Sequence, residues 1–452
     1  MAPLMISVAG VRGIVGESLT PPVLARFAAA FGGLARGPVV VGRDARVSGP
    51  MVLHAVKAGL MGAGCDVVDI GLATTPATQI AVERLAAGGG VILTASHNPA
   101  PWNALKFLSA RGEFLDAAAG AAVRERFESD HGLWVPFDRL GGERAEPGAL
   151  EWHLERVLGL PFVNAEAIRQ RGLKVVVDGC ASVGGVAVPG LLERLGATIV
   201  RLDCEPDGHF TRELEPLAEH LGALCAKVRE SGADFGVAVD PDADRAAFVD
   251  ATGQPLGEEY TVALGTHAVL EQRPGPVVTN LSTSLIIDAV CERFGAALHR
   301  TPVGEAHVVG RMHAVDAVAG GEGNGGMIVP AAHFGRDGLV AVALVAQRMA
   351  ATGLDLRALA DELPVYAMVK EKVARPESGW DGIARQLTRA FADHAVDSSD
   401  GLRFHRDSEW IHVRPSGTEP VVRLIAESPD ATRTRALLDR ASDALAAALG
   451  GS

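Results

Sequence analysis

The sequence has little cysteine and no long apolar run. Its cysteines, Cys65, Cys180, Cys204, Cys225 and Cys291, are scattered and include no CxxC pair. This spacing argues against a disulfide framework or a structural zinc site and fits a reducing compartment. No apolar run is long enough to cross a bilayer. The first residues, MAPLMISVAGVRG, lack the basic region and long apolar core of a signal peptide. We therefore expect a soluble, cytoplasmic protein that does not contact a membrane.

Positive charge is in deficit, with 42 Lys and Arg against 55 Asp and Glu and a formal net charge of −13. This balance argues against binding to nucleic acid, although it allows an anionic small substrate where cations cluster. Aromatic residues make up 5%, charged residues 21% and apolar residues 48%, so we expect packed interiors and no extended disorder. A chain of 452 residues exceeds one core, which favours three or four domains.

Short β-branched runs end repeatedly in polar or Gly-rich turns. They are VVVGRDAR from Val39, VILTASHNP from Val91, VVVDGCAS from Val175, GVAVDPDADR from Gly236 and VVTNLSTS from Val277. Runs that are apolar on both faces predict strands covered by helices on both sides. Amphipathic stretches alternate with them, such as 20–35 with Thr20 as its N-cap. The alternation predicts an α/β fold with parallel or mixed sheets and functional groups at the carboxyl ends of strands.

Three domain boundaries are predicted. They lie near Pro147, near Asp250–Gly253 and within Leu363–Glu377, where LPVYAMVKEKVARPE is interpreted as a linker. The expected domains are therefore 1–147, 148–251, 252–365 and 366–452. The last one offers strands EWIHVRP and VVRLIAES and a helix over 430–449, which is typical of a small α+β cap domain.

The densest charged motif is DPDADR, residues 240–245. Alternate residues of an extended chain are about 6.6 Å apart, so the loop must curl before its carboxylates can share one ion. Oxygen-only ligands favour a hard cation, Mg²⁺ first. An EF-hand is excluded because Arg245 and Ala251 stand where that loop needs Gly and Glu. A solvated acidic turn is the alternative.

A second motif, ILTASHNPAPWNALKF, places Ser96 where an apolar run ends, near His97 and Lys106. A hydroxyl in this position is a candidate nucleophile, phosphate carrier or helix cap. No G-x-S-x-G elbow accompanies it, which disfavours a serine hydrolase. Taken alone, this motif favours a capping serine or an Asn-Pro turn.

Two further loops carry polar groups. RPSGTEPVVR, residues 414–423, combines two arginines with hydroxyls and backbone N–H groups that suit a phosphate, with a plain hairpin turn as the alternative. GGEGNGG, residues 320–326, matches a dinucleotide fingerprint by letter, but MIVP follows where that fingerprint needs a helix. Its Glu322 and Asn324 suit a polyol, and a flexible connector is the alternative.

Taken together and in this order, these stretches resemble the α-D-phosphohexomutase family. The Gly-rich turn with Arg12 comes first, followed by T-A-S-H-N-P, D-x-D-x-D-R, G-E-x-x-G and R-P-S-G-T-E-P. The resemblance covers essentially the whole chain. It implies three related α/β domains with mixed sheets and a smaller α+β cap around a central cleft, each domain giving one loop. It also implies an isomerase that interconverts hexose 6-phosphate and hexose 1-phosphate through a 1,6-bisphosphate, which also serves as activator.

The resemblance assigns roles to individual residues. Ser96 would be the phosphoserine. One Mg²⁺ would be held by Ser96, Asp240, Asp242 and Asp244. The transferring phosphoryl would be surrounded by Arg12, His97, Lys106 and Arg245, with Lys106 or His97 moving the proton. Sugar hydroxyls would be held by Glu322 and Asn324. The other phosphate would be held by Arg414, Ser416, Gly417, Thr418 and Arg423.

The substrate sugar is where this sequence departs from the family pattern. The family's sugar loop often reads G-E-x-S-G-H, whereas here Asn324 replaces the serine and Gly326 the histidine. GGEGNGGMIVP followed by HFGRDG resembles phosphoglucosamine mutases, with phosphomannomutase/phosphoglucomutase as the alternative. The turn TPVGE, which contains Gly304 and Glu305, resembles a second specificity loop in which Glu305 would meet a substrate amine. A simple strand-to-helix turn is the alternative.

Two other function classes stay open. A metal-dependent sugar phosphatase would use the same serine and acidic loop, although the last phosphate loop disfavours it. A noncatalytic sugar-phosphate sensor would tolerate loss of Ser96 or of the acidic loop, and both are present. We expect a monomer or a homodimer.

Overall fold

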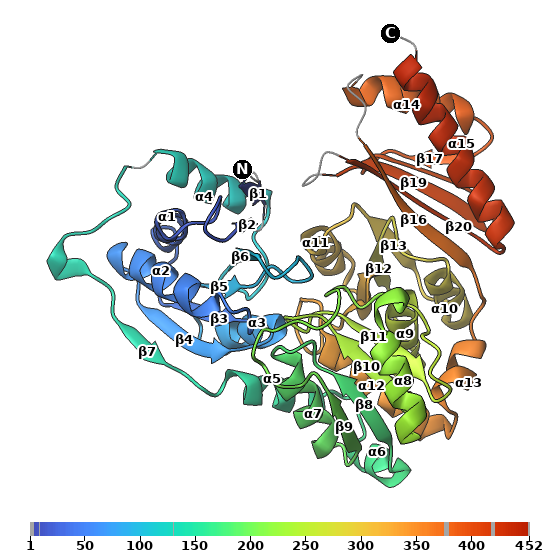
Figure 1. Ribbon diagram of the computed structural model, residues 1–452, viewed down its shortest axis with the longest axis horizontal. Helices are drawn as coiled ribbons and strands as arrows, with labels where there is room; N and C mark the ends of the chain where they lie inside the picture. The colour runs from blue at the N-terminus through green and yellow to red at the C-terminus, as the bar shows by residue number, and fades with distance from the viewer. Residues whose placement is uncertain (1–3, 9, 130, 375–378, 417–420, 451–452) are drawn as a thin grey trace.

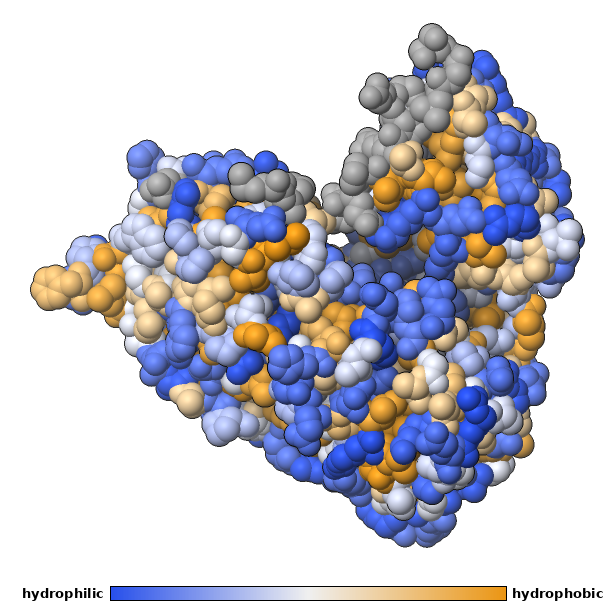
Figure 2. Space-filling view, viewed as in Figure 1, coloured by the Kyte–Doolittle hydropathy of each residue, from blue (hydrophilic) through white to orange (hydrophobic). Residues whose placement is uncertain are grey.

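The computed structural model describes residues 4–8, 10–129, 131–374, 379–416 and 421–450, with side chains up to residue 447. Its strands form four separate sheets, which follow one another along the chain (Figure 1). In the space-filling view the molecule is hollowed between the first and the fourth of these units (Figure 2). The predicted four-domain α/β class is confirmed by this arrangement. Within the described residues, no helix has the length and apolar character needed to cross a membrane.

The first domain is built on a sheet with the order β1-β2-β6-β5-β3-β4-β7. Its strands are β1 (Met5–Ser7), β2 (Gly10–Ile14), β3 (Val39–Arg43), β4 (Val67–Leu72), β5 (Gly89–Leu93), β6 (Trp102–Leu108) and β7 (Glu143–Ala145). Its helices are α1 (Pro21–Gly32), α2 (Gly49–Gly62), α3 (Thr75–Arg84) and α4 (Ala117–Ser129). Val39 and Val41 enter one apolar core while Val40 enters another, so helices cover both faces of β3 as its composition predicts.

The second and third domains each contain a four-stranded sheet. The second has β8 (Lys174–Asp178), β9 (Thr198–Leu202), β10 (Phe235–Val239) and β11 (Ala246–Asp250), with α5 (Ala149–Leu158), α6 (Ala165–Arg171), α7 (Gly184–Arg194) and α8 (Gly222–Ser231). The third has β12 (Val277–Asn280), β13 (Leu298–Thr301), β14 (Ala319–Glu322) and β15 (Gly326–Ile328), with α9 (Glu259–Gln272), α10 (Ile286–Phe294), α11 (Glu305–Val315), α12 (Gly338–Thr352) and α13 (Leu356–Asp361).

One topology recurs in the first three domains. A first strand (β3, β8 or β12) lies between two parallel neighbours, and a fourth strand pairs antiparallel with the third. These antiparallel pairs are β5 with β6, β10 with β11, and β14 with β15. The connection inside each pair leaves the carboxyl end of a parallel strand, where functional groups gather in such sheets. The three motifs around Ser96, Asp240 and Glu322 all occupy this connection.

The fourth domain is an antiparallel sheet with the order β16-β20-β19-β18-β17. Its elements are β16 (Ala367–Ala374), β17 (Ala395–Asp397), β18 (Leu402–Arg406), β19 (Glu409–Pro415), β20 (Val421–Ser428), α14 (Gly379–Ala390) and α15 (Ala431–Gly450). The predicted strands EWIHVRP and VVRLIAES coincide with β19 and β20, and the predicted last helix is α15. Leu438 and Ala441 of α15 are fully buried against the sheet, as the apolar spacing of that helix requires.

Two predictions from the sequence were wrong in detail. The supposed linker, Leu363–Glu377, contains β16, which pairs along its length with β20. Lys370 and Lys372 give the sequence of this edge strand a polar character. Charged residues are common on edge strands because they prevent pairing with another chain. The helix expected over 20–35 ends at Gly32, and the Thr20 side chain makes no capping hydrogen bond although Thr20 is the N-cap residue. The domain limits at 147, 251 and 365 stay a prediction.

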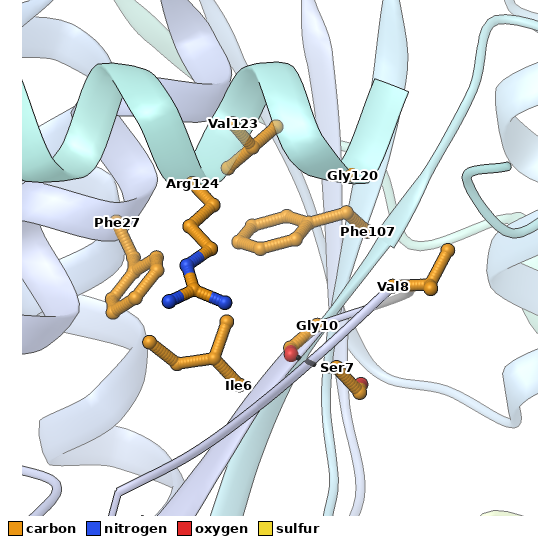
Figure 3. Close-up of a pocket in the computed structure, with 9 residues that line it drawn as sticks. All are labelled: Ile6, Ser7, Val8, Gly10, Phe27, Phe107, Gly120, Val123 and Arg124. Carbon is orange, nitrogen blue, oxygen red and sulfur yellow. Dashed lines mark hydrogen bonds between the residues drawn. The ribbon is translucent and has the colours of Figure 1, made fainter. Parts of the chain in front are cut away.

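A small void lies beneath α4 in the first domain. Figure 3 shows Phe27 and Phe107 on either side of Arg124, with Ile6 of β1 below. The void measures about 10 Å³, which is room for roughly one water molecule. It is therefore a packing gap and not a place for a ligand.

Candidate active site

The connections of the three related domains meet at one point. Ser96 Oγ, from the first domain, donates to Asp240 Oδ2 of the second at 2.8 Å. Arg336, from the third domain, donates to Asp244 Oδ2 at 2.6 Å and to Glu322 Oε2 at 2.8 Å. All five residues are less than 9% exposed. Ser96 and Asp240 are 144 positions apart in the sequence. The fold therefore brings distant residues into a single buried centre.

Ser96 is held in an uncommon backbone conformation. Its φ of +49° lies in the left-handed region, which side-chain-bearing residues seldom adopt. The backbone N–H of Ser96 donates to Thr94 Oγ1 at 2.9 Å, and Thr94 Oγ1 donates in turn to Asp44 Oδ2 at 2.6 Å. Strain of this kind persists where the surroundings fix the backbone, as they do at functional sites.

Arg46 is the side chain that fixes this loop. It is 1% exposed and donates to four loop carbonyls, those of Ser96 (2.6 Å), Asn98 (2.6 Å), Pro99 (3.0 Å) and Trp102 (2.9 Å). Asp44, which is fully buried, pairs with Arg46 Nε at 3.1 Å and balances its charge. Neither residue is predicted from the sequence, although the D-x-R that follows the β3 run is a visible signal.

The acidic turn is fully buried. One carboxylate oxygen each from Asp240, Asp242 and Asp244 lie within 4.8 Å of one another. The loop curls through Ala243, whose φ is +54°. Asp242 Oδ1 and Asp244 Oδ1 have no hydrogen-bond partner among the described residues. Buried carboxylate oxygens without donors are costly, and a cation between them would satisfy both.

Cations around this turn compensate its charge in part. Lys106 Nζ donates to Asp242 Oδ2 at 2.7 Å, and Thr75 Oγ1 donates to the same oxygen at 2.6 Å. Burial favours a neutral Asp242, yet Lys106 and Thr75 together hold its pKa below the usual range. Burial and the charges of Asp244 and Asp242 raise the pKa of Asp240 well above its ordinary value. The raised pKa of Asp240 reflects how closely the three buried carboxylates are placed.

The other residues predicted around the serine lie beside it. Arg12 Nη1 donates to Asn98 Oδ1 at 3.1 Å. Arg245 donates from Nη1 to Glu215 Oε1 at 3.0 Å, with its Nε 3.7 Å from Asp244 Oδ1. Burial, together with Arg245 and Arg12, holds the pKa of His97 well below its usual range. Arg12, Lys106 and Arg245 thus contact the serine loop or the acidic turn.

The register of β2 on β6 places the two N-terminal cations. Arg12 pairs with Ala104 and Gly10 with Lys106, so Arg12 and Lys106 project from the same face of the sheet. A Cβ at Gly10 would lie 2.1 Å from Leu105 O, so this close pairing requires glycine.

The third domain contributes two carboxylates of different character. Glu322 accepts from Asn280 Nδ2 (2.9 Å), Gly304 N (3.0 Å) and Arg336, and this fixes its orientation. Glu305, the first residue of α11, lies 2.9 Å from Arg336 Nε, but neither carboxylate oxygen has a hydrogen bond among the described residues. Burial raises the pKa of Glu305 to about 7, against the charge of Arg336. Asn324 Oδ1 is likewise without a partner there.

The fourth-domain motif continues from β19, and its described arginines lie on β19 and β20. Arg414 on β19 is directly opposite Arg423 on β20, and Arg423 is opposite Lys372 on β16. Asp400 Oδ2 pairs with Arg414 Nε at 3.1 Å and accepts from the Val303 N–H of the 301–305 turn at 3.0 Å. Gly417 and Thr418 lie outside the described residues. Lys372 was not predicted, because β16 was not recognised as a strand.

Comparison with known proteins identifies the family. Models of the phosphoglucomutase/phosphomannomutase family match four segments: alpha/beta/alpha domain I at residues 5–132, domain II at 152–253, domain III at 257–366 and the C-terminal domain at 368–444. The chain belongs to this family. It is therefore an isomerase of the phosphohexomutase type.

Two relatives and one solved structure show how similar the chain is to other members of this family. It is 38% identical to a phosphoglucomutase/phosphomannomutase of Thermococcus kodakarensis, over 98% of both chains. It is 37% identical to a probable phosphoglucosamine mutase of Methanopyrus kandleri, over 96% of both. A solved phosphoglucomutase/phosphomannomutase family protein of Burkholderia thailandensis has a TM-score of 0.85 at 26% identity, over 99% of both chains.

The four hydrogen bonds from Arg46 to the serine loop lead to a first prediction. Arg46→Lys keeps the charge beside Asp44 but cannot donate to four carbonyls at once, so the Ser96 loop should shift. Because small misplacements of reacting groups are costly, we expect mutase kcat to fall roughly 100-fold with the melting temperature little changed. The exposed Arg36→Lys change in the same domain is the control. Full activity in Arg46→Lys would contradict a positioning role.

Proposed function

We propose that this phosphohexomutase carries its phosphoryl group on Ser96 and converts glucosamine 6-phosphate to glucosamine 1-phosphate through a 1,6-bisphosphate. The main support is the 2.8 Å contact between Ser96 Oγ and a buried cluster of three aspartates. A hydroxyl beside ligands for a hard cation, surrounded by cationic side chains, suits phosphoryl transfer, which depends on positioning and charge neutralisation. Phosphomannomutase/phosphoglucomutase activity is the alternative.

The proposed reaction has two balanced transfers. A sugar hydroxyl attacks the phosphorus on Ser96. A new O–P bond forms, the bond to Ser96 Oγ breaks, and the hydroxyl proton passes to Lys106 or His97. The bisphosphate then turns in the cleft, and Ser96 Oγ attacks the phosphorus of its other phosphate. The bond from that phosphorus to the sugar oxygen breaks, the proton returns to that oxygen, and Ser96 regains its phosphoryl group. Added hexose 1,6-bisphosphate would act as activator by phosphorylating Ser96.

A single divalent cation fits the acidic turn. Ser96, Asp240, Asp242 and Asp244 supply only oxygen donors, the set that Mg²⁺ prefers. The two carboxylate oxygens without partners, Asp242 Oδ1 and Asp244 Oδ1, support this assignment. When bound, the ion would neutralise charge on the phosphoryl oxygens. A structure described as Aspergillus fumigatus N-acetylphosphoglucosamine mutase with GlcNAc-6P and magnesium shares the fold, with a TM-score of 0.62 at 17% identity.

Two groups of residues, each containing arginines, serve the two phosphates in this proposal. Arg12, His97, Lys106 and Arg245 surround the phosphoryl near Ser96. The distant phosphate binds the loop of the fourth domain, through Arg414, Ser416, Gly417, Thr418 and Arg423. The register of Arg414, Arg423 and Lys372 across three strands supports a cationic row on this sheet. Lys372 is therefore added to the phosphate-binding set.

The sugar lies between these two sites in the proposal. Glu322 and Asn324 hold its hydroxyls, and the Gly304–Glu305 turn recognises the substituent on the ring. Glu305 offers two buried oxygens without a hydrogen bond among the described residues. A protonated amine would pair with this carboxylate, whereas a hydroxyl would gain less. This preference supports glucosamine phosphate over glucose or mannose phosphate.

Ser96→Ala tests the proposal directly. We expect mutase activity to disappear, because no other group can carry the phosphoryl from one sugar oxygen to the other. Intact-mass measurement of the wild-type protein should give one phosphate per chain, located at Ser96. Ser129→Ala, an exposed hydroxyl in the same domain, should keep both properties. Wild-type speed in Ser96→Ala would refute the proposed carrier.

Metal binding supplies an independent test. Equilibrium dialysis should give one Mg²⁺ per chain, and Asp244→Asn should weaken binding at least roughly tenfold, since a hydrogen bond to a charged group alone contributes ~1.5–3 kcal/mol. EDTA should abolish isomerisation, and Mg²⁺ should restore it. Asp207→Asn, at an exposed carboxylate, is the control. Unchanged affinity in Asp244→Asn, or undiminished turnover in EDTA, would contradict the metal site.

Glu305→Gln tests the sugar assignment. Losing an amine–carboxylate pair, at ~1.5–3 kcal/mol, should lower kcat/KM for glucosamine phosphate roughly 10- to 100-fold relative to glucose phosphate. Rates should be compared on glucosamine, glucose, mannose and N-acetylglucosamine phosphates. Glu292→Gln, an exposed change in the third domain, should leave the ranking unaltered. An unchanged ranking in Glu305→Gln would favour the phosphomannomutase/phosphoglucomutase alternative.

A further inference from the structure

A second cavity lies away from this centre, between the third and fourth domains. Its volume is about 400 Å³, within the range of small-molecule sites, which is roughly 300–1,000 Å³. On one side it is walled by Leu281, Leu285 and Leu298, together with Arg300 of β13. On the other side Arg403 of β18 faces it, near the turn that joins β18 to β19.

The cavity is distinct from the candidate active site. None of the residues that line it belongs to the serine loop, the acidic turn, the 301–305 turn or the Gly-rich loop. The turn from β18 to β19 is at the opposite end of β19 from the loop that follows Pro415. A ligand here would therefore contact the two domains without competing for the groups assigned to catalysis.

Arg403 is the unusual member of this wall. It is only 6% exposed, and its guanidinium lies 4.9 Å from the centre of the Trp410 ring. It makes no hydrogen bond or ion pair with any described residue, and its buried Nε has no acceptor there. Burial and the nearby charge of Arg300 lower the pKa of Arg403 to about 9, so it is still charged at neutral pH. A buried charge without a partner is strongly unfavourable.

Asp288 and Asp397 favour the charged form of Arg403 from a distance, but no carboxylate that lines the cavity forms an ion pair with it. Most of these carboxylates are paired or hydrogen-bonded to other residues. Asp288 pairs with Arg300 at 2.6 Å. Glu409 pairs with Arg433 at 2.9 Å and with Arg406 at 3.1 Å. Asp397 Oδ1 accepts from the backbone N–H and the hydroxyl of Ser399. Their remaining lone pairs can accept hydrogen bonds from hydroxyl groups. The cavity thus combines one unpaired guanidinium, several acceptors and an apolar wall.

We propose that this cavity is a second, noncatalytic binding site for a phosphorylated sugar. Its phosphate would pair with the Arg403 guanidinium, whose planar fork suits two phosphate oxygens. Its hydroxyls would donate to the cavity's carboxylates, and its ring would pack on the three leucines. Because the ligand would touch both domains, its binding would restrain the fourth domain relative to the third. The site would thereby couple sugar phosphate concentration to the mobility of the domain that carries the distant phosphate loop.

Calorimetric titration of the full chain tests this proposal. The probe is 1,5-anhydroglucitol 6-phosphate, which lacks the anomeric hydroxyl and cannot be isomerised. We expect two sites per chain in the wild type and one in Arg403→Met. Arg389→Met, an exposed arginine in the same domain, should retain two. Since turnover plays no part, the result is independent of the proposed catalytic role of Ser96.

A second variant protects the test against misfolding of Arg403→Met. Leu298→Trp fills the cavity and leaves Arg403 in place, and it should also retain one site. Inorganic phosphate, titrated separately, should bind the second site at least tenfold more weakly than the sugar phosphate. A single site in the wild type, or two sites in both cavity variants, would overturn the proposal. Equal affinity for the two probes would overturn its assignment to a sugar.

Discussion

The candidate centre depends on one electrostatic constraint: buried carboxylates from two domains must be compensated within a few ångströms. Asp240, Asp242 and Asp244 are fully buried, and Glu305 and Glu322 of the third domain lie beside them. Arg336 spans both groups, because it reaches Asp244, Glu305 and Glu322 at once. Removing Arg336 from the assembled protein would leave these carboxylates buried without their partner, which is costly. The arginine that balances the charge of the candidate centre therefore also joins the second and third domains.

The repeated topology explains where this constraint is met. In each of the first three domains the connection from the third strand to its antiparallel partner leaves the carboxyl end of a parallel strand. Three equivalent connections can then face one another, each with different polar groups: a hydroxyl at Ser96, carboxylates at Asp240–Asp244, and the carboxylate and amide of Glu322 and Asn324. A single α/β unit, used three times, thus supplies three parts of one site.

Local pattern predicted more of the fold than of the site. Strands β19 and β20 follow from alternation within a few residues, and β16 was missed because Lys370 and Lys372 disguise an edge strand. The motif residues were found because they are dense in polar groups. Arg46 and Arg336 were not found, because their roles depend on the carbonyl or carboxylate groups that they contact in the folded chain. Arg46 donates to residues about fifty positions away, and Arg336 donates to Asp244, which is 92 positions away. Spacing along the chain carries no information about such contacts.

The third and fourth domains are joined by a different kind of contact. Glu427 of β20 accepts from the Leu285 N–H at the start of α10 (2.8 Å) and from Trp410 Nε1 (2.7 Å). Asp400 joins Arg414 to the 301–305 turn. Polar contacts of this type can exchange with water when domains move, whereas a packed apolar interface resists separation. Since the cavity at Arg403 lies along the same boundary, a ligand there would act on the contacts that hold the fourth domain, and with it the proposed phosphate-binding loop, against the third.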